Sequence, residues 1–427
     1  MAKDTDKGKL PRILMVSTEY PPMQGGVGRY TENLTISLRK EGLEVYVLCN
    51  EKGNGNYYGL STNNLDNPEV ISRAVKDSSA DLVHIQYEPG LYGLVLDSFP
   101  FPISPHKTTT TIDSFYSTSS VPIVTTFHSA YTFRQWMNLA SIAESTSKMR
   151  KYASFLSRSW KRLVNYRSVH NLNKAKWAKS KANIVFSKYL ASLIDGTNTS
   201  SENSTSSTSD HDSSIRADSE YSVIYHGAEP ISALSKREAR SMFSFPEDKR
   251  IALALGFRTS TKGWDILEKI KVPRNWLIVV NPSRNQYNPK EKLDLQFRNR
   301  NIVNLQKDVL EEEELSNLLC ASDATLLPYR VSSASGVMFD GLAHGVPFIA
   351  SDLPFFKEYS SLGLGIAVKR KPDAFANGLV MLDKEYKIYA DQVNKFKMNL
   401  KWDVVAKKHL LLYNKVLYAP TANANVN

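Results

Sequence analysis

Short, almost fully apolar runs recur along the chain, and between them lie longer segments with apolar residues every three or four positions. Apolar runs without polar alternation are typical of strands in a parallel sheet, which is buried on both faces. The runs are 12–17, 45–49, 81–87, 121–128, 182–186, 221–225, 250–257, 276–280, 301–305, 324–328 and 346–351. The helical spacing predicts helices at 29–41, 187–194, 264–270, 311–321, 335–343 and 402–418.

This alternation predicts an α/β protein with two Rossmann-like, doubly wound domains. The length of 427 residues also favours two domains over one. We expect an N-terminal domain at 11–229 and a C-terminal domain at 230–401. The amphipathic segment 402–418 is expected to pack back on the first domain. Two Ser- and Thr-rich stretches interrupt the pattern. We expect 97–120 to be an irregular surface insertion and 195–220 to be disordered.

The stretch 324–352 (ATLLPYRVSSASGVMFDGLAHGVPFIASD) indicates an anion site. A strand is predicted to enter a helix whose first residues, Ser335 and Gly336, are small, which leaves backbone N–H groups unpaired and open to a phosphate. Asp340 follows one turn after Gly336, where its carboxylate is placed to accept a hydroxyl such as that of a ribose. The alternative is an ordinary crossover between two strands, and this stretch alone leaves both open.

Further candidate residues follow predicted strands. Arg258 and Lys262 flank a small polar turn, which fits either a diphosphate clamp or a basic surface loop. His128 ends the run 121–128, and ligands of open parallel sheets bind at that edge, although a structural histidine is the alternative. Gly25 and Gly26 indicate close backbone approach or a tight turn, in a loop too long for the dinucleotide fingerprint.

The net charge of +11 is localised. Between Glu144 and Asp195 there are twelve Lys or Arg residues and no acidic one, so this segment accounts for the whole excess. Interleaved aromatic and aliphatic residues indicate basic amphipathic helices. For 148–188 we weigh a solvated helix face, a nucleic-acid groove and an anionic membrane surface. Aromatics on the apolar stripe favour the membrane over nucleic acid, with the solvated face as the main alternative.

Several classes of protein are disfavoured. No apolar run approaches the ~18 residues of a membrane span, and the start lacks the apolar region of a signal peptide. We therefore expect a cytoplasmic protein, with peripheral attachment to a membrane. Cys49 and Cys320 are isolated and are expected to be core thiols. The eight histidines form no ligand spacing, so we expect no metal. The oligomeric state is left open.

Taken in order, these motifs resemble the GT-B glycosyltransferases, whose two Rossmann-like domains face each other across a cleft. The likeness is specifically to the family 4 retaining enzymes, which use nucleotide sugars. It covers nearly the whole chain apart from the two Ser- and Thr-rich stretches. The segments that carry it are 13–30 (ILMVSTEYPPMQGGVGRY), 82–93 (LVHIQYEPGLYG), 122–131 (PIVTTFHSAY), 223–229 (VIYHGAE), 255–267 (LGFRTSTKGWDIL), 326–352 and 401–413 (KWDVVAKKHLLLY).

The resemblance implies a role for each candidate residue. Gly25 and Gly26 match the glycine loop that approaches the donor phosphate and the acceptor. His128 matches a histidine near the transferred sugar, while Arg258 and Lys262 match the pair that neutralises the leaving diphosphate. The helix-terminal amides would come from Ser335, Gly336 and Val337. The family's two donor-binding glutamates correspond to Ser332 and Asp340; aspartate still accepts ribose hydroxyls, but serine supplies no carboxylate to the sugar.

The resemblance thus implies a hexosyl-type glycosyltransferase that retains anomeric configuration, needs no metal or cofactor, and uses a nucleoside-diphosphate sugar as donor. A lipid-linked or polysaccharide acceptor fits the basic segment. Two alternatives stay open: a GT-B binding protein with weakened catalysis, which Ser332 favours, and a sugar-nucleotide epimerase of the same fold. A dehydrogenase is disfavoured because the dinucleotide fingerprint is absent.

Overall fold

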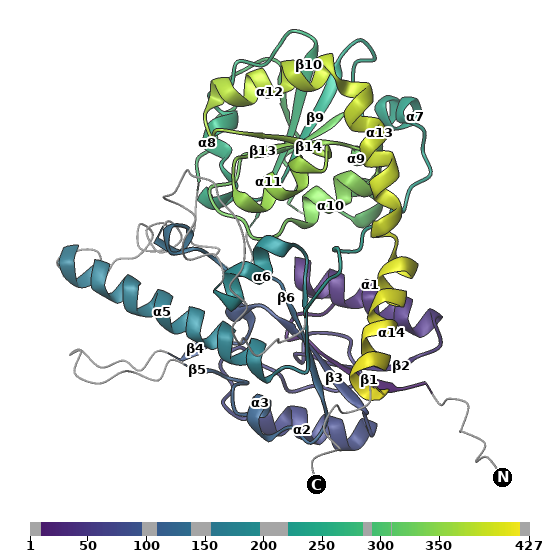
Figure 1. The fold of residues 1–427 in the computed structure, drawn as a ribbon. Helices are drawn as coiled ribbons and strands as arrows, with labels where there is room; N and C mark the ends of the chain where they lie inside the picture. Colours follow the sequence, from purple (N-terminus) through teal and green to yellow (C-terminus); the bar gives the residue numbers. More distant parts are fainter. Residues whose placement is uncertain are drawn as a thin grey trace, which may run out of the picture. The chain divides into compact units, whose positions relative to one another are not determined.

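The computed structural model describes residues 10–95, 109–137, 155–196, 221–284, 293–308 and 310–418 (Figure 1). These residues form two compact units, each built around a six-stranded sheet. The first unit takes the chain up to residue 130, residues 164–225, and the chain from residue 402 on. The second unit takes residues 131–163 and 226–401. The two-sheet α/β architecture predicted from the sequence is confirmed.

The sheet of the first unit is parallel throughout, with the strand order β2-β1-β3-β6-β7-β8. Its strands are β1 (Arg12–Val16), β2 (Glu44–Leu48), β3 (Leu82–Tyr87), β6 (Ile123–Phe127), β7 (Ala182–Val185) and β8 (Tyr221–Val223). Each lies within a predicted apolar run or overlaps it, and the last is two residues shorter than predicted.

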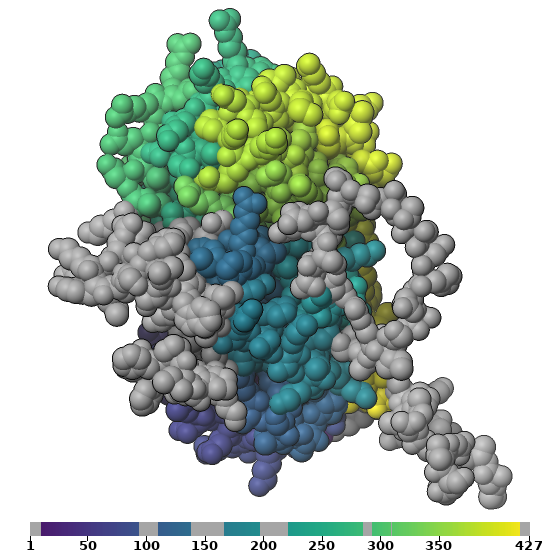
Figure 2. Space-filling view, turned by 60° about the vertical axis from the view of Figure 1, so that its left-hand side comes forward, coloured from purple at the N-terminus to yellow at the C-terminus, as the bar shows by residue number. Residues whose placement is uncertain are grey.

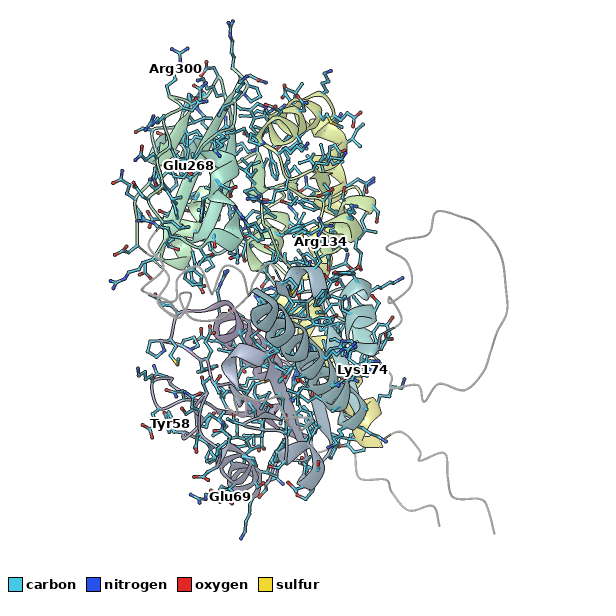
Figure 3. All side chains as sticks on the ribbon, turned by 90° about the vertical axis from the view of Figure 1, so that its left-hand side faces the viewer. Tyr58, Glu69, Arg134, Lys174, Glu268 and Arg300 are labelled. Carbon is cyan, nitrogen blue, oxygen red and sulfur yellow. The ribbon has the colours of Figure 1, made fainter. Side chains whose placement is uncertain are left out.

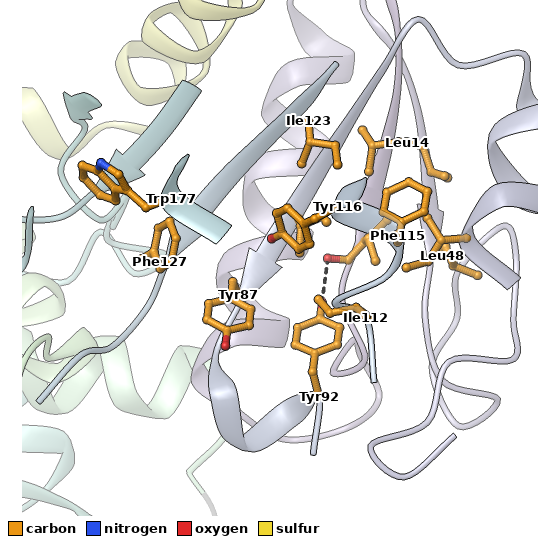
Figure 4. Close-up of a cluster of buried hydrophobic side chains, with 14 of the residues drawn as sticks. Leu14, Leu48, Tyr87, Tyr92, Ile112, Phe115, Tyr116, Ile123, Phe127 and Trp177 are labelled. Carbon is orange, nitrogen blue, oxygen red and sulfur yellow. Dashed lines mark hydrogen bonds between the residues drawn. The ribbon is translucent and has the colours of Figure 1, made fainter. Parts of the chain in front are cut away.

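Strand alternation gives this sheet two different faces. One face carries Leu14, Ile85 and Phe127, and it packs into an apolar core with α2 (Asn67–Ser78) and α6 (Lys188–Asp195) (Figure 4). The other face is covered by α1 (Gly26–Lys40) and by the C-terminal helix α14 (Trp402–Tyr418), which contact each other. Full burial of each large apolar side chain contributes about 1.5–3 kcal/mol, so this core is a main source of the stability of the first unit.

The sheet of the second unit is also parallel, with the order β11-β10-β9-β12-β13-β14. Its strands are β9 (Arg250–Phe257), β10 (Trp276–Ser283), β11 (Ile302–Asn304), β12 (Ala324–Leu327), β13 (Phe348–Ser351) and β14 (Gly365–Val368). Two apolar clusters cover its faces, one with α8 (Trp264–Leu267) and α12 (Pro372–Lys384), the other with α7 (Lys236–Met242) and α9 (Glu312–Ala321). The remaining helices are α10 (Gly336–Ala343), α11 (Pro354–Ser361) and α13 (Tyr386–Phe396).

The prediction that 97–120 is an irregular surface insertion is wrong for its second half. β5 (Thr109–Thr110) pairs antiparallel with β4 (Leu94–Val95), and the helix α3 (Phe115–Thr118) follows. Ile112 and Phe115 are fully buried in the core of the first unit. The Ser- and Thr-rich composition obscured these apolar residues, which fill one face of the sheet. Most of the other stretch, 197–220, lies outside the described residues.

Within the basic segment 148–188, the structure describes residues 155–188, which form the long helix α5 (Phe155–Lys179), the strand β7 and the first residue of α6. The described side chains of α5 appear in teal on the face shown in Figure 2. Lys174, labelled in Figure 3, is exposed. Lys176 is instead buried, ion-paired with Asp113 and placed 4.9 Å above the Tyr87 ring, so part of the excess charge is structural. The predicted aromatic stripe lies largely outside the described side chains. None of the helices in the described part of the chain is long and apolar enough to cross a membrane.

The buried histidines on the face of the first sheet that α14 covers predict that the folded state loses stability in acid. Burial lowers the pKa of His409 on α14 to about 4, and burial followed by the charges of His409 and His128 holds the pKa of His84 well below its usual value. The unfolded chain binds these protons near pH 6.5, whereas the folded chain does not, so stability falls as pH drops from 6.5 toward 4. His409 alone should cost on the order of 2 kcal/mol at pH 5.

Urea unfolding at pH 7.5 and at pH 5 measures this loss. The His409→Gln variant cannot titrate at this position, so its loss between the two pH values should be smaller than that of the wild type. Equal losses in the two proteins would show that His409 is not held neutral by the fold.

Candidate functional site

The amino end of α10 carries unpaired backbone amides. The Ser335 side chain caps the helix by accepting a hydrogen bond from the Met338 amide at 3.3 Å, and the Phe339 amide bonds the Ser335 carbonyl. Among the described residues, the amides of Gly336 and Val337 have no hydrogen-bond partner. Because the cap satisfies only the third amide, two N–H groups at the positive end of the helix stay available to an anion.

The space that a side chain at position 336 would occupy is open apart from one histidine. A Cβ atom added to Gly336 would meet only the Nε2 of His226, 4.0 Å away. The His226 ring stacks on Phe339 of α10, with centroids 5.4 Å apart, and its Nδ1–H donates to the Gly227 carbonyl at 2.9 Å. Sequence reasoning assigned no role to His226, although it directly follows the last predicted strand of the N-terminal half.

The loop after β9 is fastened to the turn that leads into α10. Gly263 has a φ of 76°, and a Cβ there would lie 1.8 Å from the Pro328 carbonyl oxygen, so only glycine allows this approach. The Arg330 amide donates to the Thr261 carbonyl at 2.8 Å. These contacts bring the Lys262 ammonium to 4.1 Å from the centre of the Tyr329 ring.

Four cationic side chains follow strands at this edge of the second sheet. Arg258 is exposed and Lys262 half-buried. Arg330 and Arg370, which follow β12 and β14, converge on Asp265. The Arg330 Nη2 lies 3.1 Å from the Asp265 Oδ2, and the Arg370 Nη2 donates a charge-assisted hydrogen bond to the Asp265 Oδ1. Asp265 partners two of the four cations, which leaves Arg258 and Lys262 as the cations offered to a diphosphate at this edge. Sequence reasoning missed Arg330 and Arg370 because only the assembled sheet brings the ends of β12 and β14 to the same edge.

The two positions that depart from the family pattern are both buried, with Ser332 5% and Asp340 4% exposed. The Ser332 hydroxyl donates to the Ala334 carbonyl at 2.8 Å and thereby stabilises the turn before α10. Asp340 lies one turn after Gly336 on α10. The structure thus gathers Ser332, Ser335, Gly336, Val337 and Asp340 in one turn and helix.

The glycine loop of the first unit surrounds a carboxylate. Glu19 follows β1, and its Oε1 accepts a hydrogen bond from the Gly28 amide at 3.3 Å, at the amino end of α1. A Cβ on Gly25 would lie 1.5 Å from this oxygen, whereas a Cβ on Gly26 would meet nothing within 4 Å. Gly25 therefore makes room for Glu19. Its predicted approach to a donor phosphate stays a prediction.

His128 lies at the carboxyl edge of the first sheet, as Glu19 does, and directly follows β6. It is buried, its ring meets those of Tyr30 and Phe186 edge-on at 5.2 and 5.3 Å, and its Nε2 is 2.9 Å from Gln86 Oε1. The predicted strand-end position is correct. The side-chain amide that holds the ring belongs to Gln86 on the neighbouring strand β3, and the sequence around His128 did not reveal this contact.

A second carboxylate at this edge, Glu88, was not singled out from the sequence. Burial raises its pKa to about 7, with a contribution from the charge of Glu19, while the Ser129 hydroxyl and the Gly90 amide act in the opposite direction. A carboxyl group with this pKa both takes up and releases a proton near neutral pH, as a general acid or base does.

Metal-binding and disulfide chemistry find no support in the residues that the structure describes. No group of three or more His, Cys, Asp or Glu side chains among them is arranged to hold a metal ion. Cys49 and Cys320 are unpaired, the former buried and the latter half-buried.

Two six-stranded parallel sheets, each flanked by helices and each with polar residues at the ends of its strands, define the GT-B fold. Sucrose-phosphate synthase from Thermosynechococcus elongatus has this fold, with a TM-score of 0.64, 13% identity and coverage of 96% of this chain and 100% of its own. HepE from Anabaena, in complex with UDP and glucose, has a TM-score of 0.60 and 13% identity, and the match covers 95% of this chain and 100% of HepE. A candidate UDP-N-acetylglucosamine 2-epimerase from Listeria monocytogenes has a TM-score of 0.54 and 9% identity, and the match covers 97% of this chain and 99% of the epimerase.

Searches with protein-family models and against curated proteins find no match.

The glycine loop yields a matched pair of variants. Gly25 has an extended backbone with a φ of 178°, so the cost of Gly25→Ala comes only from its collision with the buried Glu19 carboxylate. We expect a loss of about 1–2 kcal/mol in the free energy of unfolding as Glu19 moves from the amino end of α1. Gly26→Ala is expected to cause no loss, because alanine favours the helix.

Thermal and urea unfolding of both variants beside the wild type provide the measurement. Equal stability of the two variants would contradict the placement of Glu19 against Gly25.

Proposed function

We propose that this protein is a glycosyltransferase that moves a hexosyl group from a nucleoside-diphosphate sugar to an acceptor. The observation that carries the proposal is the pair of unpartnered amides of Gly336 and Val337 beside a strand edge rich in cations. Cleavage of the sugar–phosphate bond places negative charge on the leaving diphosphate. Preformed N–H dipoles and fixed cations stabilise that charge with little reorganisation.

Each residue has a role in this scheme. Arg258 supplies a planar fork of donors to the diphosphate and Lys262 a point charge. Asp340 accepts hydroxyls of the ribose, and the resemblance assigns His128 to the transferred sugar. Because amides and side-chain cations supply the positive charge, we propose that the reaction proceeds without a metal and with a nucleotide sugar as its donor.

The proposal extends to family 4 of the GT-B enzymes and to retention of anomeric configuration, on the sequence resemblance given above. In a retaining front-face reaction the leaving phosphate helps to remove the proton of the acceptor hydroxyl. No pair of hydrolase-type carboxylates is then needed. The serine at position 332 forms a hydrogen bond within its own turn, so the sugar is held without a carboxylate from that position.

Two other functions have a specific observation in their favour. The fold is shared with a candidate epimerase, and an epimerase would release the same nucleoside diphosphate. The serine at position 332 favours a binding protein with weakened turnover. Product analysis with UDP-, GDP- and ADP-sugars, with and without an acceptor, separates the three. A transferase forms its glycosylated product only with the acceptor, and an epimerase isomerises the sugar without one. A binding protein forms no product in either case.

The clamp is tested by Lys262→Ala. A lost charge-assisted contact to phosphate is worth about 1.5–3 kcal/mol, so the Kd for a nucleoside diphosphate should rise by roughly tenfold to a hundredfold. The Kd for the corresponding nucleoside should stay nearly unchanged. Calorimetric titration measures both. Lys269→Ala, which removes an exposed lysine from the same region, is the matched control. Equal losses for nucleoside and nucleotide would place Lys262 outside the clamp.

We also propose a peripheral membrane location, with an acceptor anchored in an anionic membrane and the exposed cations around α5 as the contact. Each exposed cation near an anionic surface contributes about 1 kcal/mol. The double change Lys174→Gln and Lys181→Gln should therefore lower the affinity for vesicles containing anionic lipid by about thirtyfold, and with it the fraction that co-sediments. Binding that is independent of anionic lipid would contradict this proposal.

The control removes the same charge from the second unit, through Lys384→Gln and Lys395→Gln, both at exposed positions. It should leave vesicle binding unchanged if the effect belongs to the region of α5.

A further inference from the structure

The loop after β9 and the turn after β12 are joined by two backbone contacts. The Arg330 amide donates a hydrogen bond to the Thr261 carbonyl at 2.8 Å. Gly263 approaches the Pro328 carbonyl so closely that a Cβ atom there would lie 1.8 Å from its oxygen. β9 and β12 are neighbours in the second sheet, so both segments leave its carboxyl edge together. The residue between the two contacts on one segment is thereby brought opposite its counterpart on the other.

These two residues are Lys262 and Tyr329. The Lys262 ammonium lies over the Tyr329 ring, 4.1 Å from its centre. The aliphatic part of the lysine passes Gly256 near the end of β9, where an added Cβ atom would lie 3.3 Å from the lysine Cε and 3.4 Å from its Cδ. The missing side chain at Gly256 and the ring of Tyr329 thus form a slot that holds the lysine along its length.

Tyr329 interacts through its ring. The side chain is 2% exposed, and the ring meets that of Phe356 on α11 edge-on, with centroids 5.7 Å apart. The hydroxyl is buried and has no hydrogen-bond partner in the part of the chain that the structure describes. A buried hydroxyl without a partner is unfavourable. The packing of the ring and its contact with the cation therefore account for an aromatic residue at this position.

The contact differs from those of the two arginines at the same edge. Arg330 and Arg370 both pair with Asp265, whose carboxylate compensates positive charge. Lys262 forms no ion pair with any residue in the described parts of the chain. An aromatic ring attracts an ammonium through its quadrupole and carries no net charge. The Tyr329 ring therefore orders Lys262 and leaves its full positive charge for an anion.

Order in the free protein favours binding because lysine has a flexible four-carbon chain. Fixing such a chain against a ligand loses rotamer freedom and weakens the complex. In the slot, that freedom is already lost when the protein folds, so less is lost when an anion binds.

We propose that Tyr329 is a positioning residue, which holds the uncompensated Lys262 ammonium in place for the leaving diphosphate. The inference rests on the proposed function for the identity of the anion. The contact between the ring and the ammonium does not depend on that function.

Nuclear magnetic resonance tests the contact without any ligand. The full chain carries lysine labelled with ¹³C at Cε, and the Lys262 signal is assigned by its loss in Lys262→Ala. Protons next to a nitrogen over a ring face are shielded by that ring. We therefore expect the Lys262 Hε signals of the wild type upfield of those of exposed lysines. Tyr329→Phe should keep this shift and Tyr329→Leu should abolish it, whereas an unshifted wild-type signal would overturn the proposal.

Calorimetric titration with inorganic pyrophosphate, which carries the diphosphate without a base, measures the consequence. Tyr329→Leu should raise the Kd by about threefold to tenfold, as for a cation–π contact of a half-buried lysine. In a protein that already carries Lys262→Ala, the same change should have no further effect, because no ammonium is left to hold. Tyr329→Phe should restore the wild-type Kd and, without the unpartnered hydroxyl, be at least as stable as the wild type.

Tyr386→Leu is the matched control, because Tyr386 also has a cation over its ring, the Arg250 guanidinium at 4.0 Å. Arg250 begins β9, so this contact lies at the opposite end of the strand from Lys262. The change should leave the Lys262 signals and the Kd for pyrophosphate as they are in the wild type. Losses as large as those of Tyr329→Leu would overturn the proposal, since the effect would then be one of general loosening.

The direction of the change in affinity separates the roles of the ring. Tighter binding in Tyr329→Leu would show that the ring holds the ammonium away from the anion. An equal loss with and without Lys262 would show that the change acts on the turn and not on the ammonium. Either result overturns the proposal.

Circular dichroism establishes that each variant is folded, and Tyr329→Met takes the place of Tyr329→Leu if the latter is not. A shifted Lys262 signal in a wild type that binds neither pyrophosphate nor a nucleoside diphosphate would overturn the proposed function and leave the contact with Tyr329 in place.

Discussion

The second unit depends on the way one strand is made to enter one helix. β12 ends against Gly263, where the absence of a side chain lets the loop after β9 approach the Pro328 carbonyl, and the turn that follows is fixed by the Ser332 hydroxyl. Ser335 then caps only the Met338 amide. The result is a rigid helix terminus with two donors left over beside a group of cations. Under the proposed function, these two donors meet the leaving diphosphate without rearrangement of the helix terminus, as charge stabilisation during bond cleavage requires.

The first unit is organised by a contrast between the two faces of its sheet. The face toward α2 and α6 carries one apolar core. The face toward α1 and α14 also buries apolar side chains, among them Ile13, Met15 and Val405. The face toward α14 places His84, Gln86 and His128 in hydrogen bonds with one another. A buried polar network contributes little net stability. Its hydrogen bonds hold these side chains in place, including His128 at the strand edge.

The departures from expectation have a common cause. The stretch around Phe115 has the composition of a loop, yet its few apolar residues are enough to complete the core. Lys176 belongs to a run of cations, yet it is the buried partner of Asp113. Composition averages over a segment, whereas burial is decided residue by residue according to which side of an element meets the sheet.

The sequence by itself determined the α/β class, all the strands of the first sheet, most of those of the second, and the helix that begins after Ser335. It did so because burial on both faces and a small-residue helix start leave local patterns that need no partner to be recognised. Only the tertiary structure decided that Arg330 and Arg370 converge on Asp265, that Glu19 occupies the end of α1, and that Tyr413 bonds His84 across 329 residues of chain. Such contacts join positions with no relation along the chain. They exist only once parallel strands have brought their carboxyl ends to one edge and α14 has packed on α1.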